Sequence, residues 1–342
     1  WGGDLMEAQG GVLVKHIREL AYMGFYEVLA NLPGIIQNFR LCKKDILEWK
    51  PDVLVLVDYP GFNLRMAAFA RKHGIRTVYY ISPQIWAWKQ SRVKKIRRDV
   101  DKMLVILPFE KDFYSRFGVD VSFVGHPLLD ALEEVERRND SHHFRTRHQL
   151  PASPLVAILP GSRKQEVTRL LGEMAAVAGD FPGHHFVVAG MSSVPRSAYD
   201  GVDAPENVSV VFDQTYALLA NAEAAMVASG TATLETALFQ VPLVVCYKAN
   251  RVSFWIARRL VKVKYISLVN LIMDRPLVKE LIQSAFHKKG VSDELALLLG
   301  DSSRRNHILS GYEELRMRLG GPGASHRAAR AIAGLAGGAS GE

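Results

Sequence analysis

The stretch Leu155-Val-Ala-Ile-Leu-Pro-Gly-Ser-Arg163 decides the fold. Its first five residues form an uninterrupted apolar run that stops at Pro160-Gly161, which is typical of a strand buried on both faces of a parallel sheet. A helical stretch begins near Glu166. The segment therefore predicts a strand, a tight turn and a helix in succession, the repeating unit of α/β proteins.

The turn in this unit has the chemistry of an anion site. Gly161 lets the backbone approach a ligand closely, and a helix N-terminus offers free N–H groups and positive dipole. Ser162 follows it, and the Arg163 guanidinium is suited to a phosphate. An ordinary turn with a surface arginine would look the same. The spacing matches neither the P-loop nor the GxGxxG dinucleotide motif.

Working outward, apolar runs alternate with helical stretches along most of the chain. The runs before the deciding stretch are at 53–57, 77–81, 103–107 and 121–124, and those after it are at 186–189, 208–212, 224–227 and 243–246. This repetition predicts two α/β domains, each a Rossmann-like doubly wound parallel sheet, that face each other across a cleft. We expect 53–57 to be buried on both faces.

Domain boundaries follow from changes in composition. Residues 133–143 are polar and 151–154 are turn-rich. We therefore predict a first domain over 1–150, a second domain over 151–320, and a flexible tail with a short helix over 321–342.

A second turn resembles the first. Ser229-Gly230-Thr231 follows an apolar run and opens a helical stretch in which Glu235 lies about one turn inside. The carboxylate of Glu235 could hold the hydroxyls of a ribose, or it could belong to a capping box with Thr231. Two phosphate-type turns in one domain favour a nucleotide diphosphate as ligand.

The first domain carries a candidate base and a basic, tryptophan-containing segment. Asp58 ends the 53–57 run, where a carboxylate in a cleft can act as a general base, although a turn-forming aspartate is the alternative. Ser82-Pro-Gln-Ile-Trp-Ala-Trp-Lys89 precedes a run rich in Lys and Arg. Trp86 and Trp88 beside these charges indicate a membrane-interface anchor or a surface for an anionic substrate, although a solvated helix face is the alternative.

Composition limits the class of protein. The 342 residues include 43 Lys and Arg against 35 Asp and Glu, a formal charge of +8 that suits an anionic partner. No nucleic-acid-binding module accompanies the charge, so no nucleic acid partner is predicted. Asp99 and Asp101 are expected to form salt bridges, and no metal site or cofactor is predicted. Two widely separated cysteines indicate a reducing compartment.

Taken together, these motifs resemble the lipid-A-disaccharide synthases, inverting glycosyltransferases of the GT-B type. The resemblance rests on six segments: 58–63, 82–88, 107–111, 125–127, 159–163 and 229–235. It implies transfer of 2,3-diacylglucosamine from UDP-2,3-diacylglucosamine to lipid X, which releases UDP and forms the β(1→6) disaccharide of lipid A. The first domain would then serve the acceptor and the membrane, and the second would bind the UDP-sugar.

The resemblance also implies roles for individual residues. Asp58 would be the catalytic base. The donor site would comprise Gly161, Ser162, Arg163, Glu166, Ser229, Gly230, Thr231 and Glu235. The acceptor and membrane side would comprise Asn63, Gln84, Trp86, Trp88, Lys89, Arg92 and His126. Asn270 is a further cleft candidate, in Leu268-Val269-Asn270 where the family often has Leu-Pro-Asn.

Other expectations follow, and alternatives stay open. The protein is expected in the cytoplasm, attached peripherally to the anionic inner-membrane surface, and a homodimer is possible. The chain opens at Trp1-Gly-Gly-Asp4 without a methionine and without the family's first strand and Gly-rich turn. We therefore expect a missing βα unit and an inactive, aggregation-prone chain. The alternatives are another GT-B UDP-sugar transferase, a UDP-sugar epimerase, or a non-catalytic nucleotide-binding fragment.

Overall fold

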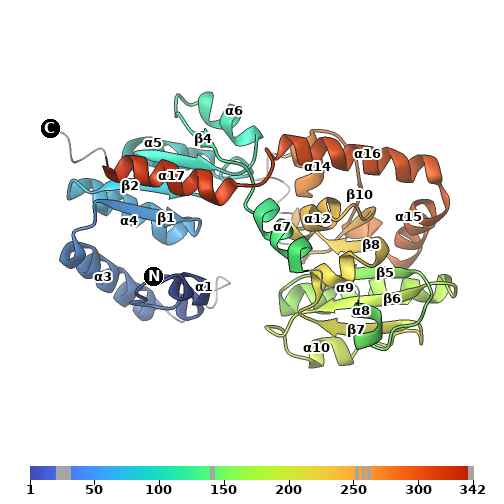
Figure 1. Ribbon diagram of the computed structural model, residues 1–342. Coiled ribbons are helices and arrows are strands. Elements are labelled where there is room, and N and C mark those ends of the chain that lie inside the picture. Colours follow the sequence, from blue (N-terminus) through green and yellow to red (C-terminus); the bar gives the residue numbers. More distant parts are fainter. Residues whose placement is uncertain (21–31, 139–142, 251–253, 256–258, 260–262, 338–342) are drawn as a thin grey trace.

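The computed structural model describes residues 1–20, 32–138, 143–250, 254–255, 259 and 263–337. They form two α/β domains side by side (Figure 1), each built on a parallel sheet. This confirms the predicted fold class. The strands are β1 Val53–Val57, β2 Arg76–Tyr80, β3 Lys102–Val105, β4 Ser122–Phe123, β5 Leu155–Leu159, β6 His185–Gly190, β7 Val208–Phe212, β8 Ala222–Ala228, β9 Leu243–Tyr247 and β10 Lys279–Ile282.

Helices connect and cover these strands. In the first part of the chain they are α1 Asp4–Ala8, η1 Ile17–Leu20, α3 Leu32–Trp49, α4 Pro60–Lys72, η2 Gln90–Arg92, α5 Val93–Asp99, α6 Phe109–Ser115, α7 Leu128–Arg138 and α8 Phe144–Arg147. In the second part they are α9 Lys164–Ala176, η3 Val177–Asp180, α10 Ser197–Asp200, α11 Thr215–Leu219, α12 Thr231–Leu238, α14 Leu268–Met273, η4 Gln283–Ala285, α15 Lys288–Gly300, α16 Ser302–Arg318 and α17 Ala324–Gly337.

The second sheet has the strand order β10-β9-β8-β5-β6-β7. The chain runs outward from β5 to β7 and then returns to the other side of β5 as β8, where Leu159 pairs with Val227. The order therefore reverses between β5 and β8. In open α/β sheets, ligands bind outside the carboxyl ends of the strands at such a reversal. The turns at 160–163 and 229–231 both leave the sheet at this point.

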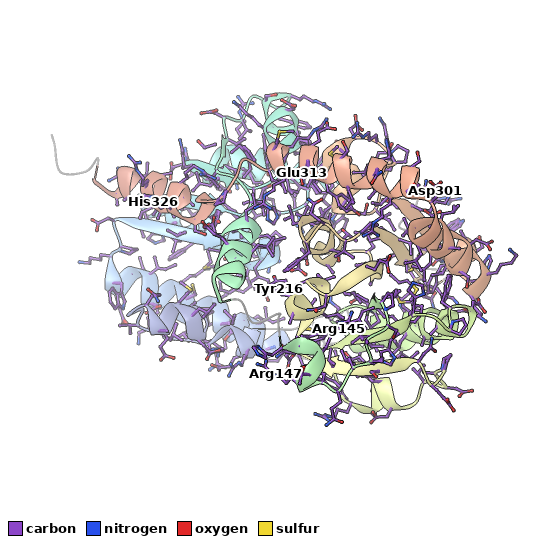
Figure 2. The ribbon with its side chains drawn as sticks, turned by 45° about the vertical axis from the view of Figure 1, so that its right-hand side comes forward. Arg145, Arg147, Tyr216, Asp301, Glu313 and His326 are labelled. Atoms are coloured by element: carbon purple, nitrogen blue, oxygen red, sulfur yellow. The ribbon has the colours of Figure 1, made fainter. Side chains whose placement is uncertain are left out.

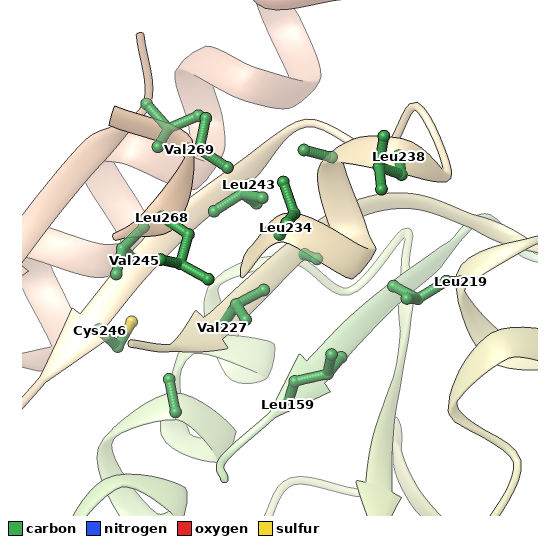
Figure 3. Close-up of a cluster of buried hydrophobic side chains, with 14 of the residues drawn as sticks. Leu159, Leu219, Val227, Leu234, Leu238, Leu243, Val245, Cys246, Leu268 and Val269 are labelled. Carbon is green, nitrogen blue, oxygen red and sulfur yellow. The ribbon is translucent and has the colours of Figure 1, made fainter. Parts of the chain in front are cut away.

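The core of the second domain explains why its strands are uninterrupted apolar runs. Figure 3 shows Leu159, Val227 and Val245 on neighbouring strands, with Leu234 and Leu238 of α12 packed nearby. All five of these side chains are buried. Both faces of the central strands are covered by helices, so alternation with polar residues is absent. This packing fixes the ends of β5 and β8 rigidly beneath the two turns.

The first sheet has its four strands in chain order, β1-β2-β3-β4. Strand β1 is at the edge and pairs with β2 alone among the described strands. Val55 and Val57 are 37% and 47% exposed. The prediction that 53–57 is buried on both faces is therefore wrong for these two residues, because an edge strand lacks a neighbour that would help to cover it.

The end of the chain also differs from its prediction. Helix α17 contains 14 residues and packs back on the first domain, where Ala328 lies against Val78, Leu104 and Val124. Figure 2 shows His326 with the first domain, while Glu313 of α16 and Asp301, the N-cap residue of that helix, lie with the second. The expectation of a flexible tail is therefore wrong for 324–337, because the small alanine face of this helix fits against the first sheet.

Candidate active site

A cavity of about 1030 Å³ lies at the reversal point of the second sheet and reaches across to the first domain. Every residue predicted for the donor site lines it: Gly161, Ser162, Arg163, Glu166, Ser229, Gly230, Thr231 and Glu235. Gln84 also lines it, from the first domain. The volume is at the upper end of the range for small-molecule sites. The structure thus brings both predicted turns, 70 positions apart, into one pocket.

The first turn is shaped around Gly161 and Glu166. Gly161 has φ +110°, a conformation that L-residues rarely adopt, and a Cβ there would collide with the Glu166 side chain. The Glu166 carboxylate accepts a hydrogen bond from the Ser162 N–H at 3.1 Å and one from the Arg163 guanidinium at 3.3 Å. A carboxylate therefore already contacts the donors that a phosphate would use at the start of α9.

The second turn, residues 229–231, is fixed by a hydrogen bond to a residue that does not line the pocket. The Ser229 hydroxyl donates to the Ile266 carbonyl at 2.9 Å, and Gly230 is the N-cap of α12. Glu235 is five residues beyond this N-cap, too far for a capping box. Instead it accepts a hydrogen bond from the Tyr216 hydroxyl at 3.3 Å, and burial raises the pKa of its carboxyl group. The capping alternative for Glu235 is therefore wrong.

Sequence reasoning missed a third segment of the pocket, residues 213–217, which follows β7. Tyr216 belongs to it, and Figure 2 shows this residue on the side of the second domain that faces the first. Its ring lies 5.5 Å from that of Phe239, and burial raises the pKa of its hydroxyl to about 12. The signal was Asp213-Gln-Thr at the end of an apolar run, which places polar residues at the same sheet edge.

Asp58 lies at the carboxyl end of β1 and is not among the described residues lining the cavity. Burial raises the pKa of its carboxyl group above the ordinary value, while a hydrogen bond from the Tyr59 N–H lowers it. Asn63, predicted for the acceptor side, donates instead to the main-chain carbonyls of Val57 and Asp58, at 2.9 and 2.7 Å. Its side chain therefore holds the backbone beside the carboxylate.

The tryptophan segment divides into buried and exposed parts. Trp86 is 7% exposed and donates its indole N–H to the buried carboxylate of Glu110 at 3.2 Å. The prediction that Trp86 anchors a membrane is therefore wrong, because its ring belongs to the core of the first domain. Trp88 is 46% exposed, with the Lys89 ammonium 4.2 Å and the Arg92 guanidinium 5.9 Å from its ring centre.

Helix α5 carries the rest of the basic run. Val93, Ile96 and Asp99 are buried, whereas the basic residues Lys94, Lys95, Arg97 and Arg98 are exposed. Arg98 pairs with Asp99 at 2.7 Å, as the sequence predicted for this aspartate. The helix therefore presents a cationic face to solvent.

Two further predicted site residues lie elsewhere. His126 is buried and accepts the Leu128 N–H at 3.2 Å, and burial lowers the pKa of its ring to about 4. The main-chain N–H of His126 donates to the Leu319 carbonyl at 3.3 Å, which joins two segments that are far apart in the sequence. His126 is not among the residues that line the cavity, and its place on the acceptor side stays a prediction. Asn270 is buried and lies outside the main cavity. Its side-chain amide exchanges hydrogen bonds with the main chain of Val278 and so connects α14 to the segment before β10.

The described residues contain no group of three or more His, Cys, Asp or Glu side chains that could hold a metal ion. Among the helices of the described part of the chain, none has the length and apolarity needed to cross a membrane.

Comparison of the sequence with known proteins identifies the family of the chain. The family model described as lipid-A-disaccharide synthetase matches residues 1–333. Lipid-A-disaccharide synthase from Syntrophus aciditrophicus is 41% identical over 336 residues, covering 96% of this chain and 87% of that protein. The enzyme of the same name from Trichlorobacter lovleyi is 40% identical over 337 residues, covering 96% and 87%.

Solved structures show the same fold at low sequence identity. The glycosyltransferase of kitacinnamycin has a TM-score of 0.63 at 16% identity, covering 97% of this chain and 89% of that one. UDP-GlcNAc 2-epimerase from Neisseria meningitidis, bound to UDP-GlcNAc, has a TM-score of 0.58 at 12% identity, covering 87% and 82%. The fold is therefore shared with both glycosyltransferases and epimerases and does not distinguish between them. The relatives that are similar in sequence are named as synthases. On its family match and its 40% relatives, the chain belongs to the lipid-A-disaccharide synthetase family.

Proposed function

We propose how this chain carries out the reaction of its family, the synthesis of lipid A disaccharide. The donor is UDP-2,3-diacylglucosamine and the acceptor is lipid X, which carries a 1-phosphate. The acceptor 6-hydroxyl attacks the anomeric carbon of the donor sugar, and the bond from that carbon to UDP breaks. One displacement inverts the configuration, so no covalent enzyme intermediate is required.

The observation that carries this proposal is the meeting of two helix-opening turns at the reversal point of the second sheet. The N-termini of α9 and α12 provide free N–H groups and the positive ends of the helix dipoles, both of which attract a diphosphate. Arg163 supplies a forked cation, and its side chain is 62% exposed and able to turn toward a ligand. We place the diphosphate of UDP at these turns and the ribose near Glu235.

UDP departs with negative charge, and the turns can stabilise that charge. Arg163 and the two helix N-termini act on the leaving group in the same positions in which they bind it. We therefore expect turnover without a bound metal ion or other cofactor, which addition of a chelator to the assay will test.

Asp58 is the residue we assign as general base. Its position at the carboxyl end of β1 is the position at which active-site residues of parallel sheets occur. Burial raises the pKa of its carboxyl group, which makes the carboxylate a stronger base than a freely solvated aspartate. It would take the proton of the acceptor 6-hydroxyl as the new bond forms, while Gln84 reaches the pocket from the same domain.

The exposed face of α5 supports association with an anionic membrane surface. Lys94, Lys95, Arg97 and Arg98 lie on it, and the half-exposed Trp88 lies just before it with two cations near its ring. Basic residues near an anionic leaflet are attracted by about 1 kcal/mol each. We therefore place the protein at the cytoplasmic face of the inner membrane as a peripheral protein; a homodimer remains a prediction.

The test is product analysis. Because the 342-residue chain is expected to be inactive, the assay uses the protein extended at its N-terminus by the family's first strand and Gly-rich turn. Incubation of this protein with UDP-2,3-diacylglucosamine and lipid X should give a disaccharide 1-phosphate and UDP, measured by mass spectrometry. Omission of lipid X is the control and should give no disaccharide. Conversion of the UDP-sugar into an isomer of equal mass, followed by proton NMR and seen with or without lipid X, would instead indicate an epimerase and contradict the proposal.

A further inference from the structure

The backbone at the carboxyl end of β1 is strained. Asp58 has φ +43° and Tyr59 has φ +44°, so two consecutive residues with a Cβ occupy the left-handed region. Helix α4 begins directly afterwards at Pro60. Strained conformations of this kind persist only where the surrounding structure determines them, and they concentrate at functional sites.

Two side chains bond the strained backbone directly. The Tyr79 hydroxyl donates to the Asp58 carbonyl at 2.5 Å. The Asn63 side-chain amide donates to the same carbonyl at 2.7 Å and to the Val57 carbonyl at 2.9 Å. The Asp58 N–H is also fixed, since it donates to the Tyr80 carbonyl at 3.0 Å. The main chain on both sides of the Asp58 Cα is therefore held by hydrogen bonds.

Both side chains are on rigid elements. Tyr79 lies in the middle of the sheet on β2 and is fully buried, and Asn63 lies in the first turn of α4. All three bonds go to main-chain oxygen atoms and leave the Asp58 carboxylate available. They therefore act on the direction in which the carboxylate points.

We propose that Tyr79 and Asn63 are positioning residues that clamp the Asp58 carbonyl and aim the Asp58 carboxylate at the acceptor hydroxyl. This inference rests on the proposed role of Asp58 as general base. A base must lie within hydrogen-bonding reach of the proton that it removes. Misplacement of about 1 Å can reduce a rate on the order of a hundredfold. Release of the clamp would let the strained residues relax and move the carboxylate.

The matched pair Tyr79→Phe and Tyr80→Phe tests the clamp, because each removes one hydroxyl from neighbouring residues of β2. For Tyr79→Phe we expect kcat for disaccharide formation to fall about ten- to a hundredfold. The affinity for UDP, measured by calorimetry, should stay within twofold. Tyr80→Phe should keep the original kcat. Asn63→Ala, at a half-buried position, should lower kcat in the same way. It replaces Tyr79→Phe as the test of the clamp if Tyr79→Phe folds poorly.

A second readout does not depend on turnover. The pKa of the Asp58 carboxyl group, followed by carbon-13 NMR and assigned by comparison with Asp58→Asn, should fall toward its ordinary value in Tyr79→Phe. The reason is that a released carboxylate becomes better solvated. A merely structural role of the hydroxyl would lower thermal stability without moving this pKa.

The outcomes separate this inference from the function on which it rests. Asp58→Asn with near-original kcat would overturn both the base assignment and the clamp. A second outcome would overturn the clamp alone. In it, Asp58→Asn is inactive, while Tyr79→Phe and Asn63→Ala have the same kcat as the Tyr80→Phe control. Loss of UDP affinity together with kcat in both clamp variants would show general damage to the fold, and the inference would then be wrong.

Discussion

Replacement of Arg163 by alanine tests the donor site most directly. Arg163 is the N-cap residue of α9 and lies at the reversal point of the second sheet, and its side chain is 62% exposed. We expect Arg163→Ala to weaken the binding of UDP without unfolding the domain, because the exposed guanidinium contributes little to packing.

The magnitude follows from two opposing contributions. A charge-assisted hydrogen bond to diphosphate contributes about 1.5–3 kcal/mol. Against this, binding must replace the contact between Arg163 and Glu166, whose side chains are 62% and 35% exposed. Exposed pairs of this kind are worth about 0–1 kcal/mol. The net loss in Arg163→Ala is then about 0.5–3 kcal/mol, equivalent to about a two- to 150-fold increase in Kd, with the middle of the range at about 1.7 kcal/mol, or about twentyfold.

Isothermal titration calorimetry with UDP measures this change. Arg169→Ala is the matched control, since it removes the same side chain from the exposed face of the same helix, away from the cavity. The control should leave the Kd within twofold of the original. If Arg163→Ala also stays within twofold, the placement of the diphosphate at the 160–163 turn is wrong.

The remaining predictions concern the base, the membrane face and a buried histidine. Asp58→Asn should reduce kcat on the order of 10²–10⁴-fold with UDP affinity unchanged, since it removes a general base; near-original turnover would make Asp58 only a turn residue. Replacing Lys94, Lys95, Arg97 and Arg98 by serine should lower co-sedimentation with anionic vesicles at about 0.1 M salt, where the Debye length is about 10 Å. Binding that persists in this variant and at high salt would contradict an electrostatic contact and direct attention to Trp88. For His126, the folded-state pKa of about 4 lies below the ordinary 6.5. The unfolded chain therefore binds the proton first, and the stabilisation present above pH 6.5 is lost as the pH falls toward 4, by up to about 3 kcal/mol. Urea unfolding of His126→Asn should lack this acid-side loss relative to the original protein; parallel pH profiles of the two would refute the neutral buried ring. The test uses the difference between the free energies of unfolding of the two proteins at each pH. This is needed because burial raises the pKa of Glu110 to about 7, so this residue makes both proteins more stable as the pH falls.

The two helix-opening turns that line the cavity could be predicted because their signals are local. A strand, a glycine turn and a helix N-terminus are adjacent in sequence, so Gly161, Arg163 and Gly230 could be assigned from short segments. Strand order was not local, but the repeated β-α pattern restricts the arrangements of a parallel sheet to a few. The sequence therefore predicted a cleft between two domains, and the structure showed that the cavity lies at the reversal point of the second sheet.

Polar residues of the first domain were harder to interpret, because a side chain's role depends on its partner. Asn63, Trp86 and His126 stand in the same motifs as exposed site residues, yet each is turned to a carbonyl, a carboxylate or an N–H of its own domain. Tyr79 was missed for the converse reason: a tyrosine within an apolar strand predicts only core packing.

The sequence by itself determined that this is a protein of two parallel-sheet domains with two helix-opening glycine turns in the second. It could do so because hydrophobic periodicity and turn chemistry act over a few residues. Only the tertiary structure decided that α17 closes on the first domain, where the Asp130 carboxylate accepts N–H bonds from Ala324 and Ser325. These contacts join residues nearly 200 positions apart. Nothing in either segment specifies the other, because such a contact is stabilised only after both surfaces have folded and lost their water.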